Sequence, residues 1–168
     1  MEAPPALIAI GSNERRKSLA ERFPRARWLT AVHPHAFVDA TARIGPGTVV
    51  FAGAVVQAEA KLGNHVIVNT GATVDHDCLI GGYAHLCPGV HLAGDVRVGE
   101  GSLLGTGTSV IPGRTIGPWA TVGAGAAVIT DLPGHITAVG VPARTLLPCP
   151  VFGVRASRCA KGPKALRF

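Results

Sequence analysis

An aliphatic residue returns at every sixth position along most of this chain. From Val38 to Val128, sixteen consecutive positions spaced by six are all Val, Ile or Leu, and no insertion breaks the frame. An α-helix repeats its apolar face every 3.6 residues and a half-buried strand every two, so neither explains a period of six. The pattern predicts a solenoid in which each hexad makes one short strand and one turn, with the aliphatic side chain pointing inward.

The remaining positions of the hexads support the same architecture. Four residues after the aliphatic position the side chain is mostly small, as at Ala54, Ala72 and Cys78. Glycine often follows the aliphatic residue directly, as in Ile80-Gly81, and permits a tight turn. Three hexads then make a triangular coil of 18 residues, and the sixteen hexads make a little over five coils.

The flanking segments have a different pattern. Residues 6–10, "ALIAI", predict a buried strand, and Ser12 or Asn13 predicts a helix cap. Residues 14–23 predict a short helix that ends before Pro24. After the last hexad, residues 131–145 predict a loop and a final short strand.

The net charge of +6 for 168 residues belongs to the end of the chain. Six basic residues and no acidic residue follow Asp131, and the rest of the chain is balanced. This distribution favours a solvated basic tail and no nucleic-acid partner, with contact to a phosphorylated ligand as the alternative role of the tail. The sequence contains no run of eighteen apolar residues, so it predicts no membrane span. The four cysteines form no CxxC pair, which favours reduced thiols in a cytoplasmic protein.

One polar cluster stands inside the aliphatic repeat, in "TVDHDCLIGGYAH". His76 lies between Asp75 and Asp77, two residues after Val74, so we expect it at the end of a strand or at a corner. One coil further along, the position of His76 is occupied by Gly94. The repeat therefore stacks a bare backbone beside a histidine, which leaves room for a ligand.

The hexads resemble the left-handed β-helix acyltransferases, which mostly act as trimers with acyl-CoA bound between subunits. Over about residues 5–146 the chain resembles the NeuD/PglD-type sugar acetyltransferases, most specifically in "HDCLIG", His85, "AGDVRVG" and "VGVPAR". These enzymes acetylate sialic acids or the amino group of nucleotide-linked amino sugars. The resemblance implies an all-β, left-handed parallel β-helix, acetyl-CoA as co-substrate, a sugar acceptor, and a homotrimer with interfacial sites.

The resemblance also implies roles for single residues. His76 is implied as the general base and Asp77 as the residue that orients it, because a carboxylate on one ring nitrogen fixes the tautomer. The implied acetyl-CoA contacts are His85, Gly94, Thr106 and Ala124. Among them, His85 is implied near the acetyl group, and the Gly94 N–H is implied to point toward the thioester carbonyl. The implied acceptor contacts are Gly11, Ser12 and Asn13, and no metal is implied.

Members of this family usually begin with a complete Rossmann-like domain that has a glycine-rich first loop. Here only its final strand and helix are expected. We therefore expect a remnant of a nucleotide-sugar-binding domain over residues 1–33, a β-helix acyltransferase domain over 34–146, and a basic tail over 147–168.

Other functions fit parts of the sequence. In one alternative, the chain is an acetyltransferase whose acceptor is serine or another small molecule. In another, the β-helix is a non-catalytic trimeric scaffold. A zinc enzyme of the γ-carbonic-anhydrase type is disfavoured, because His65, His76 and His85 share no column of the 18-residue repeat. We expect His65, His91 and His135 at the surface, Cys78 and Cys87 at small repeat positions, and Trp119 and Arg114 near the CoA groove.

Overall fold

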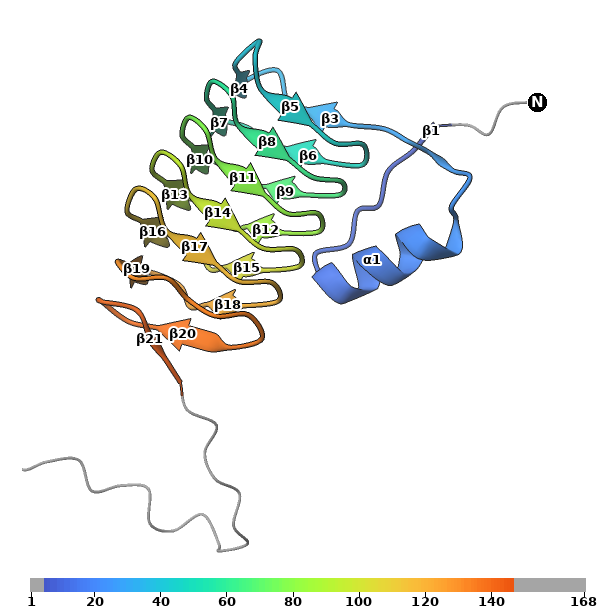
Figure 1. The fold of residues 1–168 in the computed structure, drawn as a ribbon. Helices are drawn as coiled ribbons and strands as arrows, with labels where there is room; N and C mark the ends of the chain where they lie inside the picture. Colours follow the sequence, from blue (N-terminus) through green and yellow to red (C-terminus); the bar gives the residue numbers. More distant parts are fainter. Residues whose placement is uncertain (1–4, 147–168) are drawn as a thin grey trace, which may run out of the picture.

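The structure is a computed structural model that describes residues 5–146. Most of this stretch is a three-sided stack of short parallel strands, about seven turns high (Figure 1). Inside the stack, a strand pairs with the strands 18 residues before and after it, so Thr73 lies between Val55 and His91. The predicted left-handed parallel β-helix is confirmed.

Each side of the stack is one sheet. The first face consists of β4 (Phe37–Val38), β7 (Val55–Val56), β10 (Thr73–Val74), β13 (His91–Leu92), β16 (Ser109–Val110) and β19 (Ala127–Val128). The second face consists of β5 (Arg43–Ile44), β8 (Lys61–Leu62), β11 (Leu79–Ile80), β14 (Arg97–Val98) and β17 (Thr115–Ile116). The third face consists of β3 (Ala31–Val32), β6 (Val49–Val50), β9 (Ile67–Val68), β12 (His85–Leu86), β15 (Leu103–Leu104), β18 (Thr121–Val122), β20 (Thr137–Val139) and the antiparallel β21 (Arg144–Thr145).

The aliphatic ladder fills the interior of the stack, as the sequence predicts. Val74, Leu86 and Leu104 occupy inward positions and are completely buried. The small residues at the corners, such as Ala84 and Cys78, are also completely buried. Because inward residues of one column lie directly above one another, the core is one continuous apolar column rather than a set of separate clusters.

The solenoid is longer than the little over five coils predicted. The aliphatic ladder already holds at Val32 in β3, one hexad before the predicted start, although Val32 is exposed at the open end of the stack. At the other end β20 adds a strand after Val128, but Thr121 pairs with Thr137, so this last coil is two residues shorter than the others. The six-residue frame fails there, and the loop and final short strand predicted over residues 131–145 correspond to a loop followed by two strands, β20 and β21.

The predicted buried strand at residues 6–10 is wrong. The strand β1 covers only Pro5–Ala6 and pairs with β2 (Arg27–Trp28). Leu7 is exposed, whereas Ile8 is buried. The sheet of β1 and β2 has two strands, so there is no partner strand that would order residues 7–10 as a strand.

The helix α1 (Asn13–Arg22) lies beside the edge between the second and third faces (Figure 1). Ser12 caps it, as one of the two predicted caps, because its hydroxyl accepts a hydrogen bond from the Arg15 N–H. Lys17 pairs with Glu100 at 2.5 Å. Asn13 and Arg16 are buried against the prism. Polar contacts therefore dock this helix.

The predicted division of the chain is not decided by these elements. The first strand of the solenoid, β3, lies just before residue 34, and the boundary between a remnant and a β-helix domain stays a prediction. The tail predicted over 147–168 lies outside the described residues. Within residues 5–146, no helix is long and apolar enough to cross a membrane.

The core column predicts a large difference between two leucines on neighbouring faces. Leu104→Ala should lower the free energy of unfolding by about 2–5 kcal/mol, because Leu104 is completely buried and its truncation leaves a cavity. Leu79→Ala, at an outward position that is 37% exposed, should cost less than about 1 kcal/mol. Denaturant unfolding measures both, and equal costs would contradict the inward ladder.

Candidate active site

His76 and Asp77 form a hydrogen-bonded pair at the corner between β10 and β11. Nδ1 of His76 lies 2.8 Å from Oδ2 of Asp77, and both side chains are 61% exposed. The backbone N–H of His76 donates to Oδ1 of Asp75 at 2.8 Å. Since a carboxylate can only accept, the proton of the neutral ring sits on Nδ1 and the lone pair on Nε2. The exposed Nε2 can therefore take a proton from a bound molecule.

At another corner of the fold, the turn position that corresponds to Asp77 is occupied by glycine. Asp77 has φ of 60°, in the left-handed region, which costs an ordinary residue about 1 kcal/mol and costs Asp less. At the corner between the third and first faces this position holds glycine in five successive coils, namely Gly53, Gly71, Gly89, Gly107 and Gly125. At the corner of His76 it holds Glu59, Asp77 and Asp95 in three successive coils, followed by Gly113 in the next. Since glycine also fits this turn, the backbone does not require the acids, and Asp77 and Asp95 place negative charge near the ring of His76.

This negative charge acts on His76. The hydrogen bond that His76 donates to Asp77 is the main cause that raises the pKa of His76 above its usual value, and the charge of Asp75 is the next. Burial opposes the shift only weakly, because the ring is exposed. The pair therefore stabilises the imidazolium that forms when the ring accepts a proton.

Gly94 lies directly beside the ring of His76, as the 18-residue repeat predicts. A Cβ at residue 94 would lie 2.6 Å from both Cε1 and Nε2 of His76, so no side chain fits there without moving the ring. The N–H groups of Ala93 and Asp95 donate to backbone carbonyls, but within residues 5–146 the Gly94 N–H makes no backbone hydrogen bond. Gly94 is itself buried, next to the ring of His76.

His85 lies on β12 of the third face, half-buried. It lines an apolar pocket of about 240 Å³ together with the segment 7–11, Val49, Phe51, Ile67 and Asn69. Nδ2 of Asn69 lies 3.2 Å from Nε2 of His85. Burial is the main cause that lowers the pKa of His85, and the charge of Arg16 is the next. Asn69 was missed by the sequence analysis, because it reaches His85 diagonally across the coils and shares no column with it.

The two predicted site histidines lie on different sides of one chain. His76 stands at the corner where the first and second faces meet, whereas His85 points outward from the third face. In a triangular prism a corner lies opposite the remaining face. One chain therefore does not bring His76 and His85 together.

The other predicted contacts fall in two places. Thr106 and Ala124 are exposed and lie one coil apart at the corner between the third and first faces. Gly11 and Ser12 are exposed just before α1, and Gly11 lines the pocket of His85. Asn13 is buried, and its amide donates to the carbonyls of Gly101 and Ser102. The side chain of Asn13 is thus occupied by contacts with the prism.

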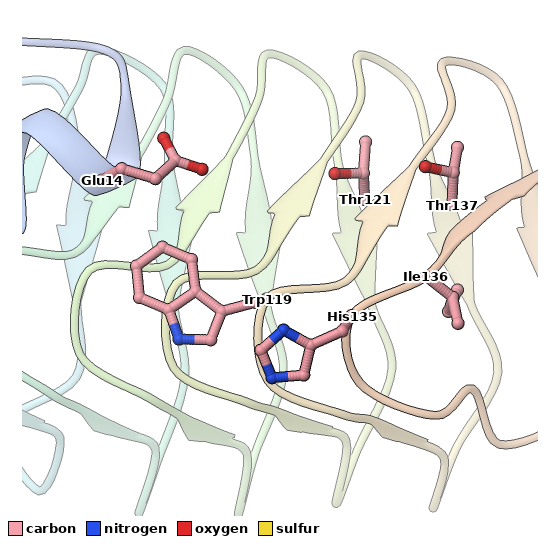
Figure 2. Close-up of a pocket in the computed structure, with 6 residues that line it drawn as sticks. All are labelled: Glu14, Trp119, Thr121, His135, Ile136 and Thr137. Carbon is pink, nitrogen blue, oxygen red and sulfur yellow. The ribbon is translucent and has the colours of Figure 1, made fainter.

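A second, more open pocket of about 560 Å³ lies between α1 and the end of the solenoid. Figure 2 shows Thr121 and Thr137 on neighbouring strands, with the rings of Trp119 and His135 on the turns beside them and Glu14 on the helix side. Trp119, which was expected near the CoA groove, lines this pocket. Arg114 does not line it and lies 3.7 Å from Asp131.

The expectation that His65 is a surface residue is wrong. His65 is 3% exposed, stacked on Tyr83 with ring centroids 5.3 Å apart and in edge contact with Trp28. It fits because the residue one coil before it is Gly47, where a Cβ would lie 2.2 Å from Nδ1 of His65. His91 and His135 are exposed, as expected. Within residues 5–146, no group of three or more His, Cys, Asp or Glu side chains could hold a metal ion.

Solved structures similar to this chain include a perosamine N-acetyltransferase and an acetyltransferase domain. PerB of Caulobacter crescentus, solved with CoA and GDP-perosamine, is 44% identical, with a TM-score of 0.83, covering 84% of this chain and 70% of PerB. The same enzyme has been solved with one histidine replaced by asparagine or alanine, again with CoA and GDP-perosamine. The acetyltransferase domain of PglB from Neisseria gonorrhoeae is 44% identical, with a TM-score of 0.81, covering 83% of this chain and 69% of that chain, and is also known with acetyl coenzyme A.

A curated relative has a related name. The UDP-N-acetylbacillosamine N-acetyltransferase of Bacillus subtilis is 51% identical over 48 residues, which are 27% of this chain. The match spans 22% of that relative's length, about a fifth. No family model matches the chain.

The pair of His76 and Asp77 predicts an ordered response of the His76 pKa to substitution. Asp77→Asn should lower the pKa of His76 toward its unperturbed value of about 6.5, because it removes the hydrogen bond and the charge that favour the imidazolium. Asp75→Asn should lower it less, since Asp75 acts on the ring through its charge.

NMR titration of the ring resonances measures these shifts. Asp131→Asn, whose carboxylate lies beside Arg114, is the matched control and should leave His76 unchanged. A His76 pKa that does not respond to Asp77→Asn would show that the 2.8 Å contact does not persist in solution.

Proposed function

This chain belongs to the left-handed β-helix sugar acetyltransferases that include the Caulobacter and Neisseria proteins, and we propose that it transfers the acetyl group of acetyl-CoA to the amino group of a nucleotide-linked amino sugar. The observation that carries the proposal is the exposed pair of His76 and Asp77 beside the bare backbone of Gly94. That geometry provides a base and an N–H donor next to each other, which is what attack on a thioester requires.

In the proposed reaction, the amino nitrogen of the sugar attacks the thioester carbonyl carbon directly. Nε2 of His76 takes a proton from the attacking nitrogen as the C–N bond forms, while Asp77 holds the imidazolium. The Gly94 N–H donates to the oxyanion of the tetrahedral intermediate. The C–S bond then breaks, and the imidazolium returns its proton to the sulfur of CoA. No acyl-enzyme is formed, and burial raises the pKa of the Cys78 thiol to about 11, which disfavours that thiol as a nucleophile.

We place the active site between subunits of a homotrimer. His76 and His85 lie on opposite sides of one prism, and Thr106 and Ala124 lie at a third place on its surface. A neighbour placed with its third face toward the corner of His76 brings the two histidines to one site. The acceptor then enters beside the segment 7–11, which already lies over His85.

We place the reaction in the cytoplasm, because the thiols of Cys78 and Cys87 are free. PerB is solved with a sugar linked to GDP, and the Bacillus relative is named for a sugar linked to UDP. The nucleotide of the acceptor is therefore the part of the substrate that an assay must vary.

Replacing His76 should abolish most of the activity without abolishing acetyl-CoA binding. With acetyl-CoA and a panel of GDP-, UDP- and dTDP-linked amino sugars, His76→Ala should lower kcat/KM by about 10²–10⁴-fold, the usual contribution of a general base. In the unaltered chain kcat/KM should rise with pH, with its midpoint above about 6.5, since only neutral His76 accepts a proton and its pKa is raised.

Release of the CoA thiol follows the reaction, and calorimetry follows acetyl-CoA binding. His35→Ala, at an exposed histidine near the first coil, is the control and should keep full activity. A His76→Ala variant with undiminished turnover would refute the assigned base. Absence of both turnover and CoA binding in the unaltered chain would favour the scaffold alternative.

Mixing two inactive variants tests whether the site is shared between subunits. His76→Ala and His85→Ala chains should each be inactive alone and should recover part of the activity after subunit exchange. The recovery is expected because a His85→Ala chain supplies an intact His76 to a neighbour that has an intact His85.

A mixture of His76→Ala with Asp77→Asn is the matched control. Both changes damage the same corner, so no pairing restores a complete base. Recovery in the first mixture and none in the control is the predicted outcome. Equal behaviour of the two mixtures, after exchange is verified by mass spectrometry, would place both histidines in a site of one chain.

A further inference from the structure

Arg16 of α1 is buried among neutral oxygens. It is 1% exposed, and burial lowers its pKa to about 10. Its guanidinium donates to the carbonyls of His65 (2.8 Å), Ile10 (2.9 Å), Gly11 (3.2 Å) and Tyr83 (2.6 Å) and to Oδ1 of Asn13 (2.8 Å). Burying a guanidinium without a carboxylate is costly, so this arrangement needs all of its hydrogen bonds.

The carbonyls that Arg16 holds belong to two different parts of the molecule. Ile10 and Gly11 end the segment 7–11, which covers the third face. Tyr83 forms the turn that leads into β12, where His85 is the first residue. Gly11 and His85 line the same pocket. Arg16 therefore ties together two walls of the pocket that contains His85.

The hydrogen bonds around His85 define where its proton lies. Oδ1 of Asn69 accepts from the Thr70 N–H at 2.8 Å, so the amide NH₂ of Asn69 faces His85 and donates to Nε2. The proton of the neutral ring is then on Nδ1. Nδ1 is buried and has no hydrogen-bond partner among residues 5–146, and the Gly11 backbone raises the pKa of His85 against the larger effects of burial and Arg16. A backbone group that raises the pKa of a histidine is an acceptor, so it is the Gly11 carbonyl.

We propose that Arg16 is a positioning residue of the transfer site, which holds Gly11 and the turn at Tyr83 beside the pocket of His85 and thereby fixes the orientation of this ring. That orientation includes the contact of Nε2 with Asn69, which places the proton of the ring on Nδ1. The inference rests on the proposed acetyl transfer, because it gives the ring of His85 a place in that site. It goes beyond that function by assigning a role to a residue of α1 that does not itself touch the reacting atoms.

The surroundings of His85 make Arg16 the charge to test. In β9 and β15, Ile67 and Leu103 lie in register with His85, and the segment 7–11 carries no charge. Arg16 is the charged residue, among residues 5–146, whose charge lowers the pKa of His85. Removing Arg16 should raise the pKa of His85, because the burial of the ring and the charge of Arg16 both lower this pKa. The Gly11 backbone raises the pKa, but its effect is smaller.

The experiment compares Arg16→Met and Arg16→Lys with Lys17→Met in the full chain. Lys17→Met removes the ion pair with Glu100 and so loosens the same helix without touching Gly11. Nitrogen-15 NMR of ligand-free protein gives the pKa and tautomer of His85, and steady-state kinetics gives kcat. Arg16→Met should raise the His85 pKa toward about 6.5 and lower kcat by about 10–100-fold, as expected for a displaced site group. Arg16→Lys should weaken the preference for the Nδ1–H tautomer while keeping the charge.

The control decides between positioning and simple stability. A folded Arg16→Met protein whose His85 pKa and kcat match those of Lys17→Met would overturn the proposal, even if its melting temperature fell. If Arg16→Met does not fold, Arg16→Lys decides: an unchanged His85 tautomer and kcat overturn the proposal, and a change in both supports it. If the unaltered chain transfers no acetyl group, the proposed function fails, while the NMR comparison still tests the link from Arg16 to His85.

Discussion

The parallel pairing of residues 18 positions apart is the constraint on which the rest of this molecule depends. It stacks like positions of the hexads into columns, so inward positions form one apolar core and outward positions form three faces. The same register puts Gly94 beside His76 and Gly47 beside His65. A bulky side chain in one coil is thus accommodated by a missing side chain in an adjacent coil. Both the core and the site follow from this single rule.

The corners are where chemistry enters without disturbing the core. Val74 and Ile80 keep the aliphatic frame on either side of His76, and both are buried. The turn between them tolerates Asp77 in the left-handed region, where another corner uses only glycine from Gly53 to Gly125. The acids therefore cost little in folding and supply the field that favours protonated His76. At the corner that faces α1, the left-handed turn position of the described coils carries no acid. There Arg16 donates to the carbonyl of Tyr83, and Lys17 lies over the rings of Tyr83 and Trp119, so these contacts dock the helix.

The sequence predicted the repeat, the cap at Ser12 and the contact of His76 with Gly94, because each depends on spacing along the chain. It failed where contacts connect different columns. Asn69 meets His85 across coils, and His65 is buried because Arg16 and Trp28, which lie outside the hexads, cover it. The segment 7–11 is apolar in sequence, yet it lines a pocket and does not form a buried strand. Periodicity carries no information on such contacts.

The central claim is that His76 of one subunit and His85 of another form one acetyl-transfer site. A crystal structure of the assembly with CoA and a nucleotide-linked amino sugar tests it most directly. The account predicts a trimer in which the sulfur of CoA and the amino group of the sugar lie within hydrogen-bonding reach of Nε2 of His76, with His85 of the adjacent subunit facing them. A structure in which CoA binds away from His76, or in which one chain alone encloses both ligands, would contradict it.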